Sequence, residues 1–434
     1  MSVLKFRRKL YNGIALPVAY GFAHLAAVFR PKIRQALRGR KGVNDRWVEA
    51  GTNLPAKPVW FHVASVGEYE QARPLIAALG KTRPEIPIVV SFTSPSGFDY
   101  ASEKEKLEGS ENVCFIDYLP IDFVGNVRLC LEALDPRLLV FVKFDLWPNL
   151  VWEAAARGVP MVLIDATLSE TSNRYRSAGK RFYGTVYDKL DKIIAISQTD
   201  AKRFRECVPD HSGISVAGDT RFDRVMERKK LSATPRPRIE RDGRRVFLAG
   251  STWPKDEIHL LGAVARVARN NRNLLVVIAP HEPVDERVAE LRAWAGDNSL
   301  SVITLGALNG ERRPADQQVI IVDSVGVLAE LYGCADLAYV GGSFSTGVHN
   351  VIEPAIMGIP VLFGPVNKNS FEALELLSNK AAIEVANEED IYDSLTTLLK
   401  NDDKRADMGR RARQYVESHL GATERCLQAI QEYL

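Results

Sequence analysis

The sequence predicts an α/β protein made of two doubly wound parallel sheets in tandem. Its 434 residues exceed the roughly 250–300 residues at which single hydrophobic cores stop growing. Short apolar, β-branched runs alternate with helix-like segments, which indicates parallel βαβ units. These runs form two series, separated by a charged, proline-containing stretch at residues 228–245.

Each series supplies the strands of one predicted sheet. In the first series the expected strands are Val59–Val63, Ile86–Ser91, Val113–Asp117, Leu138–Val142, Met161–Asp165 and Lys192–Ile196. In the second they are Val246–Ala249, Leu274–Ala279, Val302–Leu305, Val319–Val322, Leu337–Val340 and Pro360–Phe363. We therefore predict an N-terminal segment (1–45), a first domain (46–227), a linker (228–245) and a second domain (246–434). Such sheets bind ligands beyond the carboxyl ends of their strands, so two in tandem predict a central cleft lined by those loops.

The N-terminal segment is basic and apolar. Met1–Ala50 holds eleven Lys and Arg against Asp45 and Glu49, a net charge of +9, whereas the whole chain carries only +3. Ile14–Phe29 is sixteen mostly apolar residues between two basic clusters, which is short for a membrane-spanning helix of about 20 residues. This pattern favours a monotopic anchor on an anionic bilayer, with no nucleic-acid partner. A cleaved signal peptide and a helix buried against the first domain are the alternatives.

Composition argues against several other classes of protein. The five cysteines are scattered and include no C-x-x-C pair, which favours a reducing compartment. No G-x-G-x-x-G follows a predicted strand and no P-loop motif occurs. The seven histidines show no metal-ligand spacing. Neither a metal nor a cofactor is therefore expected.

Three loops of the first domain carry candidate catalytic residues. Glu68 follows the first strand, where it could act as a base, but Ser65 and Glu68 also have the spacing of a capping box. Lys143 and Asp145 follow the fourth strand, either shaping the acceptor side of the cleft or lying in an ordinary loop beside a core Trp147. The Arg221 guanidinium suits a phosphate, although such an arginine more often pairs with a neighbouring Asp.

In the second domain, polar loops follow the strands and could bind a nucleotide. The longest, Gly341–Pro354, is a glycine-rich turn leading into a helix whose free N–H groups could receive a phosphate, with Glu353 near a ribose hydroxyl. A tight turn and a structural His349 are the alternative interpretation. The other candidate donor-binding residues lie in three shorter loops: Ser251, Thr252, Pro280, His281, Val325, Gly326 and Val327.

Taken together and in this order, these loops resemble the 3-deoxy-D-manno-octulosonic acid (Kdo) transferase family, glycosyltransferases of the GT-B fold. The resemblance spans nearly the whole chain. It includes the basic, apolar N-terminus and three elements: H-x-A-S-V-G-E at His62–Glu68, L-W-P-N at Leu146–Asn149, and G-G-S…H-N-x-x-E-P at Gly341–Pro354.

The resemblance implies an inverting transfer of Kdo from CMP-Kdo to a lipid A precursor, lipid IVA, in lipopolysaccharide biosynthesis. The protein would act at the cytoplasmic face of a Gram-negative inner membrane. Glu68 would be the general base and Arg221, where the family usually has Lys, the stabiliser of the transition state. The matching CMP-binding residues would be Pro280, His281, Val325, Gly326, Val327, Asn350, Val351, Ile352 and Glu353.

Two positions depart from the family pattern. His281 replaces a common Arg, which leaves one phosphate or base contact open. Lys143 stands at the first Glu of the usual E-T-E-L-W-P-N element, which reverses the charge. Either Asp145 takes over the acidic role, or the acceptor differs, or Glu68 is tuned differently.

Three alternative functions stay open on the sequence. Another GT-B transferase, using a UDP-sugar and a lipid acceptor, would differ in its donor. A sugar-nucleotide epimerase would convert a free UDP-sugar without an acceptor. In a non-catalytic nucleotide-binding membrane protein, Glu68 would only cap its helix.

Overall fold

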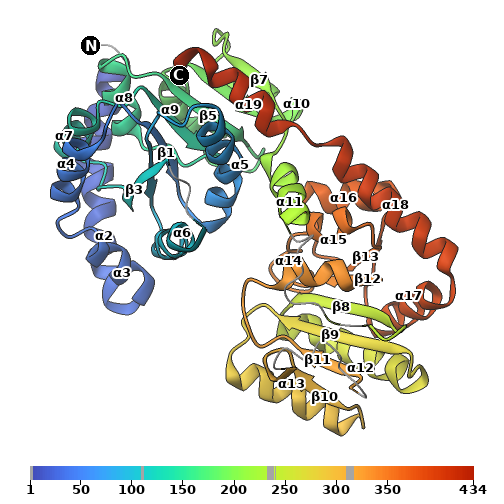
Figure 1. Ribbon diagram of the computed structural model, residues 1–434. Helices are drawn as coiled ribbons and strands as arrows, with labels where there is room; N and C mark the ends of the chain where they lie inside the picture. Colours follow the sequence, from blue (N-terminus) through green and yellow to red (C-terminus); the bar gives the residue numbers. More distant parts are fainter. Residues whose placement is uncertain (1–2, 109–111, 232–238, 240, 309–316) are drawn as a thin grey trace. The chain divides into compact units, whose positions relative to one another are not determined.

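The computed structural model describes residues 3–108, 112–231, 239, 241–308 and 317–434. It divides into two compact units, Met1–Arg224 with Leu420–Leu434, and Val225–His419. Residues 228–231 of the predicted linker continue a helix, and residues 232–238 and 240 lie outside the described part. Each unit contains one parallel sheet, and we describe the units one at a time (Figure 1).

The sheet of the first unit has the strand order β3-β2-β1-β4-β5-β6-β7, and every pairing is parallel. Its strands are β1 (Val59–Val63), β2 (Ile88–Phe92), β3 (Val113–Tyr118), β4 (Leu138–Val142), β5 (Met161–Ala166), β6 (Lys192–Ala195) and β7 (Ile214–Val216). The chain leaves β1 toward β2 and β3, then returns to β4 on the other side of β1. The strand order therefore reverses between β1 and β4, which is where sheets of this kind bind ligands.

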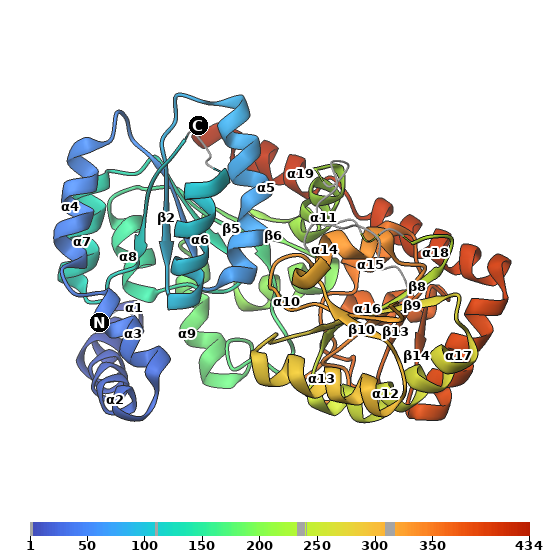
Figure 2. The same ribbon diagram turned by 60° about the horizontal axis from the view of Figure 1, so that its bottom comes forward.

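Helices cover both faces of this first sheet (Figures 1 and 2). One face packs on α4 (Val43–Asn53), α7 (Val124–Leu134), α8 (Pro148–Ala156), α9 (Ser177–Tyr187) and α10 (Gln198–Cys207). The other packs on α5 (Val66–Thr82), α6 (Pro95–Glu108) and α19 (Ala422–Ile430). Alternate residues of β1 point to opposite cores, Trp60 to the first and Phe61 to the second, as the two-residue period of a strand requires.

The second unit repeats the plan with the order β10-β11-β9-β8-β12-β13-β14. Its strands are β8 (Arg245–Thr252), β9 (Leu274–Pro280), β10 (Val302–Thr304), β11 (Val319–Ile321), β12 (Leu337–Val340), β13 (Val361–Phe363) and β14 (Ala382–Glu384). Its helices are α12 (Pro254–Asn270), α13 (Asp285–Asp297), α14 (Leu328–Leu331), α15 (Ile352–Met357), α16 (Phe371–Ser378), α17 (Glu388–Lys400) and α18 (Asp402–Ser418). Here the strand order reverses between β8 and β12.

The last helix belongs to the first unit, although the sequence division placed residues 420–434 in the second domain. Helix α19 buries Cys426 and Ile430 in the core beside α5. The Asp223 carboxylate accepts hydrogen bonds from the backbone N–H groups of Gly421 (2.7 Å) and Thr423 (2.6 Å) at the start of α19. Asp223 lies in α11 (Thr220–Leu231), so this helix start is fixed by a carboxylate from a distant part of the chain.

The N-terminal segment is helical: α1 (Val3–Leu10), a π-helical turn (Tyr11–Ala15), α2 (Leu16–Phe29) and α3 (Pro31–Gly39). Pro17 has no N–H group to continue an α-helical ladder, which accounts for the π turn before it. The stretch Lys5–Phe29 is long and apolar enough to cross a membrane, and 11% of its most apolar window is buried. The apolar helical stretch Lys5–Phe29 is thus longer than the Ile14–Phe29 run, which on the sequence alone is short for a membrane-spanning helix.

One face of this segment docks on the first unit. Tyr11 donates a hydrogen bond to Asp122 (2.9 Å), and Asn12 donates one to Asn149 (2.9 Å). The Tyr20 ring packs edge-on against Phe123. The side chains on the opposite face are exposed, so the segment packs on the first unit through one face and is not fully buried.

Candidate functional site

Glu68 lies in the first turn of α5, directly beyond the carboxyl end of β1. Ser65 caps this helix and accepts a hydrogen bond from the Glu68 backbone N–H (3.5 Å). The Glu68 carboxylate in turn accepts one from the Ala64 N–H (2.5 Å). Ser65 therefore caps the helix, the Glu68 carboxylate binds the backbone just before the cap, and the question is whether that carboxylate can also act as a base.

The environment of Glu68 increases its basicity. Its side chain is buried, and loss of hydration raises the pKa of the Glu68 carboxyl above its usual value. The Ala64 N–H opposes this increase, the Asp145 carboxylate adds to it, and Lys143 and His62 oppose it. A carboxylate with a raised pKa accepts a proton more readily, which is what general-base catalysis requires.

A buried chain of hydrogen bonds orients the group next to Glu68. The Trp60 indole N–H donates to Ser91 Oγ (2.8 Å), and the same oxygen lies 2.8 Å from His62 Nδ1. His62 Nε2 lies 3.2 Å from Asp145 Oδ2. Both ring nitrogens of this fully buried histidine therefore have polar partners, which fix the orientation of its ring.

Asp145 is held in its ionised form. Burial alone would raise the pKa of Asp145, but hydrogen bonds from His62, Thr93 (2.8 Å) and Trp147 (3.3 Å) outweigh burial and hold it below the usual value. Asp145 is therefore a weak base that places a negative charge near Glu68. Two neighbouring carboxyl groups with pKa values moved in opposite directions suit different chemical roles. Trp147 is itself partly buried against the core, as the alternative interpretation of this loop expected.

Lys143 directly follows β4 and has a left-handed backbone conformation, with φ of +66°. That conformation is unfavourable for a residue with a side chain and is held here by a hydrogen bond from its N–H to the Ile164 carbonyl (2.9 Å). Its ammonium lies 5.4 Å from the centre of the Phe144 ring and acts on Glu68 by lowering its pKa. The family's usual acidic position therefore holds a cation within electrostatic range of the candidate base.

Arg221 begins α11 and pairs with Asp219. Its backbone N–H donates to Asp219 Oδ1 (2.8 Å), and its guanidinium donates twice to Oδ2 (2.8 and 2.6 Å). The Arg221 side chain is 41% exposed, so one side of the guanidinium faces solvent. Pairing with a neighbouring Asp is the alternative role that the sequence left open for Arg221, and this ion pair with Asp219 is present. The same ion pair fixes the direction in which the guanidinium points.

The Arg221 loop is tied to the helix that carries Glu68. Thr220 Oγ donates to the Gln71 carbonyl of α5 (2.7 Å), and Gln71 donates to Asp219 (3.5 Å). The Thr220 N–H donates to the fully buried Asp165 (2.9 Å). Burial and the neighbouring Asp219 raise the pKa of Asp165 well above its usual range. Asp165 and Gln71 were not predicted, because their contacts come from elements distant in sequence.

In the second unit, one buried carboxylate holds the two loops at the reversal of strand order. Asp256 of α12 accepts hydrogen bonds from the N–H groups of Trp253 (2.9 Å), Gly342 (2.8 Å) and Phe344 (3.1 Å), and from the Tyr339 hydroxyl (3.0 Å). Sequence reasoning missed Asp256. Its signal was its place three residues after the helix start at Trp253, the spacing of a capping box.

Glycine is required where these loops approach one another. A Cβ on Gly341 would lie 2.1 Å from the Ser251 carbonyl oxygen. Gly342 has a φ of +80°, which residues with side chains rarely adopt. Ser251 itself has a φ of +54°. The glycine pair thus allows the loop after β12 to pass against the carboxyl end of β8.

Three rings stack at the carboxyl ends of β8, β9 and β12. The His281 ring lies 4.6 Å from the Trp253 ring and 4.6 Å from the His349 ring, and the centres of those two rings are 6.4 Å apart. The Trp253 indole N–H donates to His349 Nε2 (2.8 Å), so that nitrogen is an acceptor and His349 is neutral. Burial and the neighbouring His281 lower the pKa of His349. His349 thus has a structural role, whereas His281 stays exposed to solvent.

The remaining donor-binding candidates differ in availability. Thr252 is buried and donates its hydroxyl proton to Glu257 (2.7 Å), so this hydroxyl serves the fold. Asn350 Oδ1 accepts from the Ile352 N–H (3.0 Å) at the start of α15, and Glu353 pairs with Arg228 (3.3 Å). Val325 is exposed beside Gly326, whose φ is +87°. Pro280 ends β9, Val327 caps α14 and Val351 is buried before α15.

Within the described residues, no group of three or more His, Cys, Asp or Glu could hold a metal ion.

Sequence comparison identifies relatives over nearly the whole chain. Residues 35–224 match the family model described as 3-deoxy-D-manno-octulosonic-acid transferase (kdotransferase). The chain is 32% identical over 408 residues to the 3-deoxy-D-manno-octulosonic acid transferase of Bordetella pertussis, covering 90% of this chain and 91% of that one. It is 28% identical over 426 residues to the Haemophilus influenzae transferase of the same name, covering 97% and 96%.

Structure comparison identifies the fold. The UDP-GlcNAc 2-epimerase of Neisseria meningitidis, bound to UDP-GlcNAc, aligns with a TM-score of 0.62 over 86% of this chain and 100% of that one, at 15% identity. A putative UDP-N-acetylglucosamine 2-epimerase from Listeria monocytogenes aligns with a TM-score of 0.60 over 87% and 96%, at 14% identity. At these identities the likeness concerns the fold alone, and it confirms the predicted GT-B-like architecture of two parallel α/β sheets.

Proposed function

Because this chain belongs to the Kdo transferase family and is therefore a glycosyltransferase, we propose that it transfers Kdo from CMP-Kdo to a lipid A precursor, lipid IVA. The observation that carries the mechanism is the buried Glu68 carboxylate at the reversal of the first sheet, with its raised pKa. The relatives' shared name supports Kdo as the transferred sugar. The identity of the acceptor is the more specific part of the proposal, and the assay described below tests it.

In the proposed reaction Glu68 removes the proton from a sugar hydroxyl of the acceptor. The resulting oxygen attacks the anomeric carbon of Kdo as the bond to the CMP phosphate breaks, and CMP leaves with the bonding electrons. A single displacement inverts the configuration at that carbon. General-base assistance of this kind is worth about 10² to 10⁴ in rate.

Arg221 is proposed to stabilise the negative charge that develops on the departing phosphate. Its pairing with Asp219 supports this, because the ion pair fixes the guanidinium while leaving one side exposed. On the donor side, the His281 ring offers a flat exposed surface, and the glycine-rich loop supplies backbone groups. Ser251, Asn350 and Glu353 remain proposed contacts to CMP.

We place the protein as a monotopic enzyme at the cytoplasmic face of the inner membrane. Support comes from the apolar helix Lys5–Phe29, one face of which is bare, and from the basic residues around it. A phosphorylated, acylated acceptor would meet the enzyme at that surface, together with anionic lipid. The membrane placement and the acceptor proposal therefore support each other.

The first test is a mass-spectrometric assay of purified protein with CMP-Kdo and a tetraacylated lipid A precursor in detergent. Wild type should add Kdo, and Glu68→Gln should be slower by about 10² to 10⁴. Glutamine can still accept the Ala64 hydrogen bond, so this variant keeps that bond and removes the base. The matched control Ser65→Ala removes the capping hydroxyl and keeps the carboxylate.

The outcomes separate the alternatives. Equal activity of Glu68→Gln and wild type would reduce Glu68 to a helix cap. Kdo addition by neither protein, with CMP still bound, would contradict the proposed acceptor. Conversion of a free UDP-sugar without an acceptor would favour an epimerase, whose fold this chain shares.

A further inference from the structure

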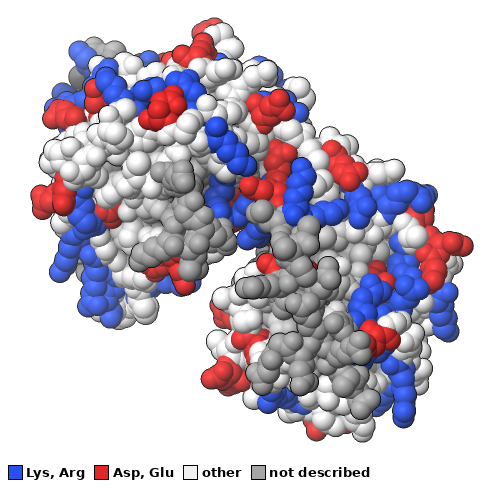
Figure 3. All heavy atoms as spheres, in the orientation of Figure 1, with Lys and Arg blue, Asp and Glu red and all other residues white. Residues whose placement is uncertain are grey.

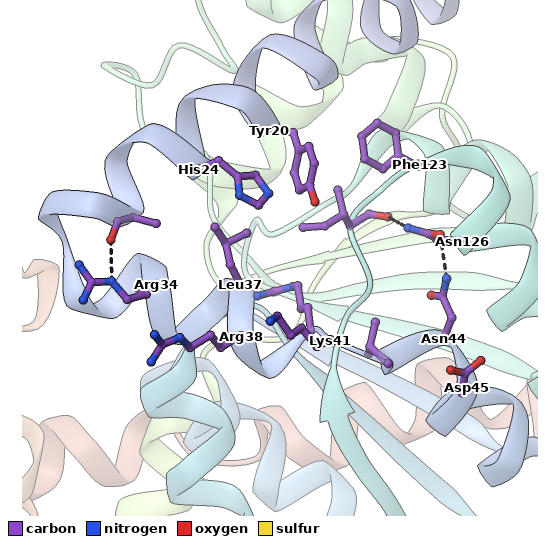
Figure 4. Close-up of a pocket in the computed structure, with 15 residues that line it drawn as sticks. Tyr20, His24, Arg34, Leu37, Arg38, Lys41, Asn44, Asp45, Phe123 and Asn126 are labelled. Carbon is purple, nitrogen blue, oxygen red and sulfur yellow. Dashed lines mark hydrogen bonds between the residues drawn. The ribbon is translucent and has the colours of Figure 1, made fainter.

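A pocket of about 720 Å³ lies in the first unit beside the membrane helix. Its wall is formed by α2, by α3 and the turn that follows it, and by the segment around Asn126 (Figure 4). Tyr20 and His24 of α2 line one side, and Arg38 and Lys41 line another. Pockets of this volume hold ligands of small-molecule size. None of the residues proposed above for Kdo transfer lines it.

The pocket is positively charged, and two of its cations are unused. Arg34, Arg38, Arg40 and Lys41 line it against a single carboxylate, Asp45. The Arg34 guanidinium donates to the carbonyls at the end of α2, and that of Arg40 donates to the Leu119 and Thr93 carbonyls. The side chains of Arg38 and Lys41 have no hydrogen-bond or ion-pair partner among the described residues. Two cations without partners on one pocket are suited to an anionic ligand.

The backbone that carries these two cations is held in place. Arg46 of α4 donates to the carbonyls of Gly39 (2.9 Å) and Lys41 (2.7 Å), and Asp117 of β3 fixes the same guanidinium (2.6 Å). Arg40 donates to the Leu119 carbonyl (2.8 Å). The turn between α3 and α4 is thus bonded to the domain on both sides. The pocket is pre-formed rather than assembled by the ligand.

The same helix that lines the pocket exposes an apolar stripe. Tyr20, His24 and Ala27 face the pocket. On the other side of α2, Val18 (64% exposed), Phe22 (71%), Leu25 (68%) and Phe29 (86%) follow the helical repeat and stay exposed among the residues that the structure describes. A helix is only about 10 Å across, so a lipid whose acyl chains contact this stripe has its headgroup within reach of the pocket. In Figure 3, Lys and Arg gather at the α3 end of this unit.

We propose that this pocket binds the phosphate-bearing headgroup of an anionic bilayer phospholipid, with Arg38 and Lys41 as the phosphate contacts. The acyl chains stay in the bilayer against the stripe of α2. This ligand is a structural lipid that orients the enzyme on the membrane, distinct from the acceptor. The proposal depends on the membrane anchoring proposed above, and it does not depend on Kdo transfer.

The test uses full-length protein in a non-ionic detergent, titrated calorimetrically with dihexanoyl phosphatidylglycerol below its micelle concentration. We expect saturable binding of one lipid per chain, and at least tenfold weaker binding by Arg38→Gln/Lys41→Gln. The control Arg30→Gln/Lys32→Gln removes two cations of the same segment that do not line the pocket, and it should bind like wild type. All four side chains are exposed, and equal melting temperatures would show that the variants fold.

Three results would overturn the proposal. They are equal weakening by both double variants, equal binding of dihexanoyl phosphatidylcholine, and no saturable binding at all. The other phosphate source, the acceptor itself, is tested by steady-state kinetics without phospholipid. Under the proposal, Arg38→Gln/Lys41→Gln keeps the acceptor KM of wild type, whereas a raised KM would assign the pocket to the acceptor and overturn the proposal. If no Kdo transfer occurs, the lipid titration still gives its own answer.

Discussion

At the scale of single residues, the candidate site of the first unit centres on the pKa of one carboxyl group, that of Glu68, and on the charges around it. Burial raises the pKa of Glu68, Asp145 adds to that increase, and Lys143 opposes it. Asp145 is held ionised by His62, Thr93 and Trp147, so it acts on Glu68 through its charge. Of the alternatives raised by the charge reversal at Lys143, this environment favours a different tuning of Glu68.

The first prediction concerns the pH dependence of the rate. The base must be deprotonated, so kcat/KM should fall as the pH decreases through the pKa of Glu68, at a higher pH than for an ordinary glutamate. Lys143→Gln removes a positive charge and should move this decrease to higher pH. Asp145→Asn removes a negative charge and should move it to lower pH. Shifts in the same direction for the two variants would contradict this account of Glu68.

The second prediction concerns stability. A carboxyl group whose pKa is higher in the folded state contributes stability below its unfolded pKa, and that contribution is lost as the pH rises through the folded pKa. The ionised Glu68 therefore costs stability at neutral pH. In denaturant titrations Glu68→Gln should be more stable than wild type at pH 8, with a smaller difference at pH 4. A difference that grows toward acid pH would be inconsistent with the raised pKa.

At the scale of elements, the loops at each reversal of strand order are held by buried polar groups. In the second unit Asp256 gathers backbone N–H groups from the loops after β8 and β12. In the first unit the loop before α11 is fixed to α5 through Thr220. These hydrogen bonds restrain the short loops that follow the strands at each reversal.

The third prediction is that Asp256→Asn disorders the donor loops. The new amide group would face the N–H donors of Trp253 or Gly342, so a donor would meet a donor in a buried site. We expect a loss of about 3 kcal/mol in unfolding free energy and weaker CMP binding. Urea denaturation and CMP titration measure these. Asp297→Asn, on an exposed acid of α13, is the control, and equal behaviour of the two would remove Asp256 from this role.

At the scale of the whole molecule, the two ends of the chain complete the first unit. The N-terminal helices dock on it through Tyr11 and Asn12, and α19 returns to its core after the second unit is finished. The first unit thus contains both the apolar helical stretch Lys5–Phe29 and the candidate base. We infer that membrane attachment and acceptor chemistry belong to the same folded body.

The fourth prediction concerns membrane attachment. Phe22→Ser/Phe29→Ser should lower sedimentation with anionic vesicles by at least about tenfold, because burying each Phe stabilises by about 1.5–3 kcal/mol. The control Ile258→Ser/Val284→Ser changes two exposed apolar residues of the second unit. Equal loss of vesicle sedimentation in both variants would indicate nonspecific adsorption through exposed apolar residues rather than a membrane-binding face on α2.

The sequence alone determined the local and periodic features of this protein. β-branched runs predicted β1, β4 and β12 to the residue, and the spacing after β1 predicted Glu68 in a first helical turn. The short edge strands β7 and β14 were not predicted. The family resemblance, carried by motifs in the loops, is confirmed by the relatives.

Only the tertiary structure decided which distant residues meet. The His62 to Asp145 hydrogen bond joins β1 to the loop after β4, the stacked rings come from three loops, and Asp223 fixes α19 across nearly two hundred residues. The exposed apolar stripe of α2 and the pocket on its opposite side also depend on which face of α2 packs against the first unit. Local patterns reflect neighbours within one helical turn or strand. Contacts between elements depend on the register and packing of the complete sheets, which no short stretch of sequence contains.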